Sequence, residues 1–115
     1  MTVEQLVERF VAIALDQDRA IRSDKNADYN RFYDQLEAVK QELRSRTGDQ
    51  RRALISLYAH PNAQARLKSA IATLALAPEA ARRTLQGISD RQEYPQAADA
   101  RGMMSALDDG SFVPG

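Results

Sequence analysis

Apolar residues recur at every third or fourth position through most of this sequence, and this helical spacing is the feature that most limits the fold. β-Branched and aromatic residues never alternate over the length of a strand. Turn residues are scarce, with five glycines and four prolines in 115 residues. We therefore expect an all-α fold. A chain of this length can bury one hydrophobic core, so we also expect a single domain over residues 1–115.

Apolar stripes and end signals predict six helices. The expected ranges are 2–21, 24 or 27–46, 50–59, 63–76, 78–89 and 95–110. Thr2 and Gln5 have the spacing of a capping box, and Asn62 is the expected N-cap of the fourth helix. Pro78 and Pro95 suit the first position of the last two helices. Gly48 is placed to end the second helix, and the His60-Pro61 step to end the third.

Two groups of apolar residues are expected to pack against these helices. Tyr29, Phe32 and Tyr33 lie on one stripe of the second helix, where we expect them to pack against the first and fourth helices. Phe112 and Val113 follow the last helix and are too apolar for a free tail. We expect both to fold back onto the last helices.

A repeat is present in the second half of the chain. Residues 51–57 and 82–88 share the pattern Arg-Arg-x-Leu-x-x-Leu/Ile, and each copy is followed by a proline and a small-residue helix. A unit of this length is the size of an α-solenoid repeat, which must stack on its neighbours to bury its apolar face. We expect a short right-handed α-α superhelix in three antiparallel helix pairs.

The stretch over residues 54–76 resembles a HEAT repeat, in which a leucine-rich helix leads through a proline turn into a helix with an arginine and small residues. The matching residues are Leu54, Leu57, Pro61, Arg66, Ala70 and Leu74. His60 stands before the proline, where that family often has an acidic residue.

Over nearly its whole length, the sequence is also similar to an uncharacterised bacterial family known as domain of unknown function 2019. The similarity lies in the Leu-x-x-Leu-Tyr-Ala-His-Pro-Asn stretch at 54–62, the Leu-Ala-Pro-Glu-Ala-Ala-Arg stretch at 76–82, and Ala-Leu-Asp-Asp-Gly at 106–110 with Phe112 and Pro114. The resemblance implies a HEAT-like helical fold and no established activity.

The net charge of zero conceals an uneven distribution of charged residues. Residues 47–91 hold seven basic and three acidic side chains, and residues 92–115 hold one and four. Arg51, Arg52, Arg82 and Arg83 are either ion-paired within the chain or form a basic ridge for an acidic partner. With Tyr94, the aromatic residue we expect to be most exposed, they are the candidate partner-binding residues.

Few residues in the sequence are of a type or spacing typical of a catalytic, metal or cofactor site. The chain has no cysteine and one histidine, His60, for which capping the last carbonyls of the third helix is the simplest role. Asp108 and Asp109 are adjacent and point to different faces of a helix, so we expect them to be solvated. No glycine-rich phosphate loop is present. We therefore expect no catalytic residues, no metal and no cofactor.

The expected function is protein–protein interaction through a HEAT-like surface, without enzymatic activity. One alternative is a phosphate or nucleic-acid binder that uses stacked arginine pairs, although the balanced charge argues against nucleic acid. Another is a protein that neutralises a toxin or regulates one partner.

No apolar run approaches the ~20 residues of a membrane span, and no leader follows Met1, so we expect a bacterial cytoplasmic protein. The sequence is compatible with association of the chain with a second copy of itself.

Overall fold

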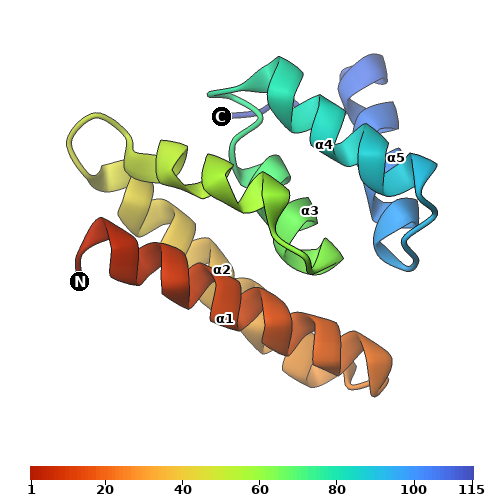
Figure 1. Ribbon diagram of the computed structural model, residues 1–115, viewed down its shortest axis with the longest axis horizontal. Helices are drawn as coiled ribbons and strands as arrows, with labels where there is room; N and C mark the ends of the chain where they lie inside the picture. The colour runs from red at the N-terminus through yellow and green to blue at the C-terminus, as the bar shows by residue number, and fades with distance from the viewer. The chain divides into compact units, whose positions relative to one another are not determined.

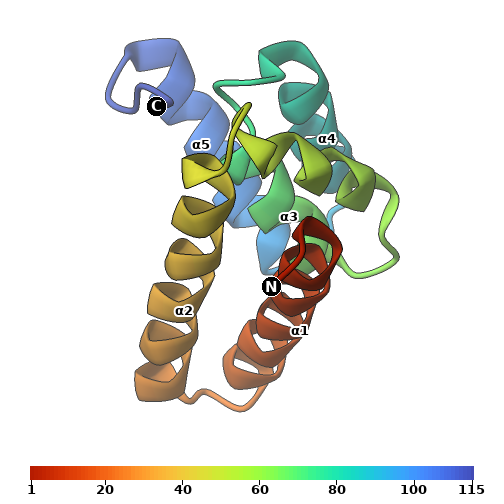
Figure 2. The ribbon, with the colours of Figure 1, turned by 90° about the vertical axis from the view of Figure 1, so that its left-hand side faces the viewer.

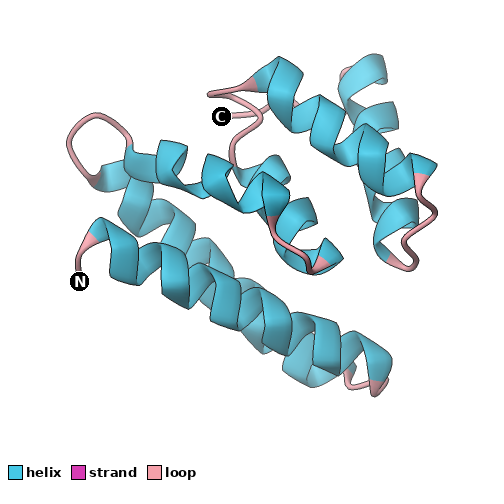
Figure 3. Cartoon of the chain, viewed as in Figure 1, coloured by secondary structure: helices cyan, strands magenta, loops and turns pink.

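The computed structural model describes residues 1–115 and consists of helices and loops, which confirms the all-α class (Figure 3). Its helices are α1 (Val3–Arg22), α2 (Asn26–Ser45), the 3₁₀ helix η1 (Gln50–Ala59), α3 (Ala63–Ala72), α4 (Pro78–Asp90) and α5 (Gln96–Asp109). The chain divides into two compact units, a first unit of Met1–Ala53 and a second unit of Leu54–Gly115.

In the first unit, α1 and α2 pack side by side as a hairpin (Figures 1 and 2). The predicted capping box begins α1, because Thr2 Oγ1 accepts the Gln5 N–H at 3.1 Å and Gln5 Oε1 accepts the Thr2 N–H at 2.8 Å. Buried apolar residues follow helical spacing on both helices. They are Leu6, Phe10, Ile13 and Ala14 on α1, and Leu36, Val39 and Leu43 on α2.

The aromatic residues of α2 lie at the edge of this core. Tyr29 and Phe32 are half-buried, and Tyr33 is 45% exposed. Tyr33 thus departs from the expectation that all three pack against neighbouring helices, and none of the three is a fully buried core residue. The buried stripe of α2 begins only at Leu36, one turn beyond Phe32.

The second helix ends at Ser45, and a tight turn follows it. The Asp49 N–H donates to the Arg46 carbonyl at 3.0 Å, and Gly48 within this turn has φ of +81°. Glycine adopts this left-handed conformation without the steric cost that a side chain brings. Gly48 thus shapes the turn, three residues after the helix has ended.

The third predicted helix forms over the expected residues but is wound as a 3₁₀ helix, η1. With three residues per turn, positions 51, 54 and 57 lie on one face. Arg51, Leu54 and Leu57 are all buried, at 4%, 0% and 8% exposure. The tighter winding therefore turns Arg51 toward the same side as the two leucines. His60 follows η1, and its N–H donates to the Leu57 carbonyl at 3.0 Å.

In the second unit, α3, α4 and α5 pack against one another around one core (Figure 1). The buried members are Leu67, Ala70, Leu74, Ala81, Leu85, Ile88, Ala97, Ala100 and Met104. Tyr58, Ile71, Met103, Leu107 and Phe112 pack against them. Each large apolar side chain that is fully buried contributes roughly 1.5–3 kcal/mol, so this core is the main stabilising element of the unit.

Three ends in the second unit differ from the prediction. Helix α3 stops at Ala72 and not at 76, because the Thr73 hydroxyl donates to the Ser69 carbonyl at 2.8 Å and competes with further helix. Pro95 precedes α5 as its N-cap and does not occupy the first helical position. Phe112 folds back onto the core as expected, but Val113 is 79% exposed.

Replacing Asn62 with alanine should lower the free energy of unfolding by about 1 kcal/mol. Asn62 Oδ1 accepts the N–H groups of Gln64 and Ala65 at 2.9 and 3.1 Å, and the methyl group of alanine cannot. Urea denaturation followed by circular dichroism measures the change. Asn62→Asp keeps the acceptor and should stay near the wild type, and equal losses in both variants would contradict the capping role.

Candidate functional site

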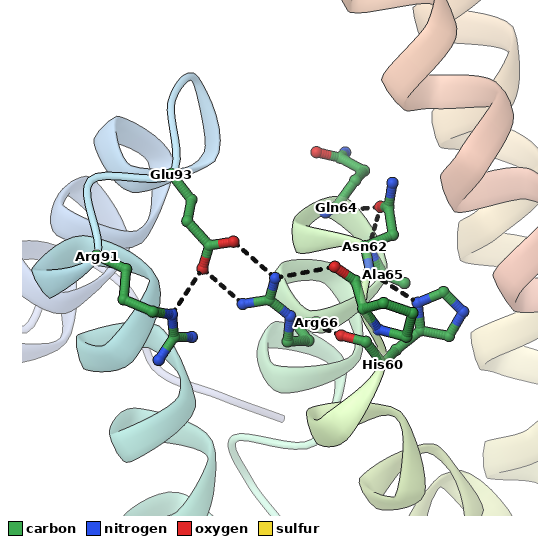
Figure 4. A network of polar contacts seen from close by, with 8 residues as sticks. His60, Asn62, Gln64, Ala65, Arg66, Arg91 and Glu93 are labelled. Atoms are coloured by element: carbon green, nitrogen blue, oxygen red, sulfur yellow. Dashed lines mark hydrogen bonds and ion pairs between the residues drawn. The ribbon is translucent and has the colours of Figure 1, made fainter.

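A buried arginine at the start of α3 joins two loops of the second unit (Figure 4). Arg66 donates from Nε to the His60 carbonyl at 2.7 Å and from Nη2 to the Pro61 carbonyl at 3.3 Å. Its Nη1 and Nη2 also donate to Glu93 Oε1 and Oε2, at 2.6 and 2.7 Å. This two-pronged contact with a carboxylate is the strongest form of ion pair that side chains make. It ties the turn before α3 to the loop between α4 and α5.

Glu93 is shared by two arginines. Arg91 Nε donates to Glu93 Oε1 at 3.0 Å, on the side away from Arg66. The hydrogen bond from Arg66, followed by the one from Arg91, lowers the pKa of Glu93 from 4.5 to about 2. The same contact raises the pKa of Arg66. Two guanidinium groups therefore face one carboxylate, and the cluster keeps an excess of positive charge.

The His60 side chain acts in the turn that follows it. Its Nδ1 accepts the Asn62 N–H at 3.0 Å, so the imidazole supports the turn into α3. The backbone N–H of His60 donates to the Leu57 carbonyl of η1, but the imidazole does not cap that helix as expected. Its own carbonyl oxygen is an acceptor for Arg66, which links the turn to the ion pair.

Two buried amides connect α3 and α5. Gln96 Nε2 donates to Gln64 Oε1 at 3.0 Å, and the two side chains are 2% and 0% exposed. A buried amide without a partner is costly, so this contact helps to set how α5 lies against α3.

The first arginine pair, Arg51 and Arg52, belongs to the first unit, and its two members have different surroundings. Arg51 is buried, and its Nη2 lies 2.7 Å from Asp49 Oδ2. The hydrogen bond from Arg51 lowers the pKa of Asp49, and the same bond raises that of Arg51. Arg52 is exposed. Of the two, only Arg52 is placed on the surface.

The second arginine pair, Arg82 and Arg83, lies on α4 in the second unit. Arg82 Nη1 and Nη2 donate to the two carboxylate oxygens of Asp108 on α5, at 2.8 and 3.0 Å. This hydrogen-bonded pair lowers the pKa of Asp108 and raises that of Arg82. Arg83 is exposed and lines a surface cleft. Asp108 is therefore a partner of Arg82 and not simply a solvated residue.

Tyr94 is 54% exposed, and the guanidinium group of Arg101 lies against it. The Arg101 guanidinium lies over the Tyr94 ring, 5.3 Å from the centroid, and also hydrogen-bonds the Tyr94 hydroxyl. Arg101 Nε and Nη2 donate to Ser89 Oγ and to its carbonyl, at 2.8 and 3.1 Å. The result is an exposed aromatic ring whose position is set by an anchored guanidinium.

Comparison with known families matches residues 4–108 to a domain of unknown function (DUF2019). The chain belongs to this family. Among solved structures, it is similar to that of the protein RPA1889 from Rhodopseudomonas palustris CGA009. The two sequences are 41% identical, the match covers 100% of this chain and 95% of the other, and the TM-score is 0.97. No curated protein matches the chain.

No helix combines the length and apolar character that crossing a membrane requires. The structure contains no group of three or more histidine, aspartate or glutamate side chains arranged to hold a metal ion.

Sequence reasoning singled out Tyr94 but not the residues that hold its surroundings in place. Glu93 binds Arg66, which lies 27 residues earlier, and Arg101 binds Ser89, which lies 12 residues earlier on the other side of the α4–α5 turn. Arg66 matches the arginine of a HEAT repeat, but His60 stands before Pro61, where that family often has an acidic residue. The partner is Glu93 instead, 27 residues later, and no spacing rule in this DUF2019 sequence indicates that pairing.

Replacing Arg66 with methionine should lower the free energy of unfolding by about 3 kcal/mol, because it removes the buried hydrogen bonds that Arg66 donates to the Glu93 carboxylate and to two carbonyls. Chemical denaturation measures the change. Arg83→Met is the matched control, since Arg83 is exposed on the same unit and its loss should cost less than about 0.5 kcal/mol. Equal costs in the two variants would contradict a stabilising role for Arg66.

The Glu93 ion pair should also make stability fall in acid. Its pKa is lower in the folded protein, about 2, than the ordinary 4.5, so its contribution is complete above about pH 5 and is lost as the pH falls toward about 2. Between these values, wild-type stability should therefore fall more steeply than that of Glu93→Gln, which cannot titrate. Thermal unfolding over a pH series tests this, and parallel curves would contradict it.

Proposed function

We propose that this protein is a protein–protein interaction module with a HEAT-like helical surface, and that it catalyses no reaction of its own. The HEAT-like part is supported by the repeated Arg-Arg-x-Leu-x-x-Leu/Ile element. Its apolar positions are buried in both copies, at Leu54 and Leu57 in η1 and at Leu85 and Ile88 in α4. The helix that follows each copy begins directly after a proline turn, at residue 63 or 96.

The observation that carries the interaction role is the exposed pair of Tyr94 and Arg101. Tyrosine and arginine are the residue types that contribute most of the energy at protein interfaces. Binding usually costs free energy because mobile side chains must be ordered. Here Ser89 already anchors Arg101 through two hydrogen bonds, and Arg101 in turn stacks on the Tyr94 ring. Much of that ordering cost is met before a partner arrives.

The charges favour a protein partner over a nucleic acid. Arg51 and Arg82, one from each pair, already bind Asp49 and Asp108. Only Arg52 and Arg83 remain as exposed members of the pairs, which is a small number of cations for binding a phosphate backbone. Neutralising a toxin, or regulating one partner, would be a specific form of the same interaction role.

Tyr94→Ala should abolish or strongly reduce binding of the partner that the wild-type protein captures. The experiment uses the full chain as bait in extract from its native organism, with quantitative mass spectrometry of the bound proteins. Loss of this interface tyrosine should reduce recovery at least about tenfold, equivalent to roughly 1.4 kcal/mol or more.

Tyr33→Ala is the matched control, because Tyr33 is also an exposed tyrosine, 45% exposed, but belongs to the first unit. It should capture the same partner as the wild type. Circular dichroism of both variants shows that they are folded. Equal recovery with the two variants would exclude Tyr94 from the interface, and the absence of any wild-type-specific partner would contradict the interaction role.

A further inference from the structure

A surface cleft of about 320 Å³ lies along α4 in the second unit, away from any role assigned above. Its lining residues are Tyr58, Ala80, Arg83, Thr84, Gly87 and Arg91. Arg83, Gly87 and Arg91 are four residues apart and so share one face of the helix. The cleft is thus lined by two arginines and by the glycine that stands between them in the sequence.

Gly87 makes room for one of these guanidinium groups. A Cβ atom added to Gly87 would lie 3.1 and 3.3 Å from Nη1 and Nη2 of Arg91, closer than side chains normally approach. The Arg91 side chain therefore folds back along α4 into the space that a larger residue would fill. A side chain at this position would therefore push the Arg91 guanidinium away from the helix.

The orientation of Arg91 is set from outside the cleft. Its Nε donates to Glu93, and Glu93 is itself held by the buried Arg66. This contact uses Nε, so Nη1 and Nη2, which lie over Gly87, can donate to a further acceptor. An arginine held in this way loses little side-chain entropy when it binds an anion.

The groups around the cleft leave it positively charged. Arg66 and Arg91 share one carboxylate, and Arg83 is exposed and adds another positive charge. Burial raises the pKa of Tyr58, which stays neutral and contributes an aromatic wall. Arg83 also lines the adjoining cleft with Glu79, Arg82 and Gln86, where the acidic group is Glu79.

We propose that this cleft binds a carboxylate side chain from an acidic segment of a partner protein, between the guanidinium groups of Arg83 and Arg91. A planar carboxylate matches the paired N–H groups of a guanidinium. An extended phosphate backbone fits less well, because Arg83 and Arg91 are only two exposed cations and cannot neutralise a series of successive phosphates. This inference depends on the proposed function in one respect, which is that the bound carboxylate belongs to a partner protein.

The test is a nuclear magnetic resonance titration of the full ¹⁵N-labelled chain with short synthetic peptides. The probe is an acetylated, amidated hexapeptide of alternating glutamate and glycine, and its control is the same peptide with glutamine in place of glutamate. The glutamate peptide should shift the Gly87 amide and the Arg91 Nε–H in a saturable way, and the glutamine peptide should not.

Two variants test the geometry separately from the charge. Arg91→Gln removes the cation and should weaken binding of the glutamate peptide about tenfold. Gly87→Gln keeps every charge but puts a side chain in tight contact with the Arg91 guanidinium and displaces it, so it should weaken binding to a similar extent. Its control is Gly102→Gln on α5, where an added Cβ meets no atom within 4 Å, and this variant should bind as the wild type does.

The same titration is carried out with inorganic phosphate and with a single-stranded oligonucleotide. Preferential binding of either one would overturn the carboxylate assignment, and failure of the glutamate peptide to bind would overturn the site. Equal binding by Gly87→Gln and Gly102→Gln would overturn the role given to Gly87. Tyr94→Ala should leave peptide binding unchanged, so a failure of this proposal is distinguishable from a failure of the Tyr94 interface.

Discussion

The ion pair between Arg66 and Glu93 holds the turn before α3 against the loop between α4 and α5, and the polar contacts of the second unit are arranged around it. Arg66 satisfies two carbonyls of the turn before α3 and the carboxylate of the loop after α4, so one side chain sets the distance between two loops. Its side chain is only 9% exposed, and a buried charge that lost its partner would be costly. The same carboxylate positions Arg91 beside the cleft, which makes the surface features dependent on the buried pair.

Arginines in this protein divide into those that hold the structure and those that are exposed to solvent. Arg51 and Arg66 are buried and each binds a carboxylate, while Arg82 connects α4 to α5. Arg83 is exposed, and Arg91 and Arg101 are held by neighbours in positions where they remain accessible. Counting basic residues along the chain therefore overstates the charge that a partner would meet.

The two copies of the sequence repeat bury the same apolar positions but do not wind in the same way. The first forms a 3₁₀ helix and the second an α-helix. With three residues per turn, Arg51 lies on the face of Leu54, whereas in the α-helix Arg82 lies at the edge of the buried face and reaches Asp108. Equivalent arginines in the sequence thus have different roles, because a helix period sets which side a residue faces.

The sequence by itself determined the all-α class, the capping residues Thr2 and Asn62, and most helix boundaries, because apolar spacing and capping act over a few neighbouring residues. Tertiary structure decided the 3₁₀ winding of η1, the burial of Arg51 and the choice of Glu93 as the partner of Arg66. Those outcomes depend on which side chains meet after the helices pack. Ion pairs form between whichever charges packing brings within reach, and no local spacing rule encodes a contact across 27 residues.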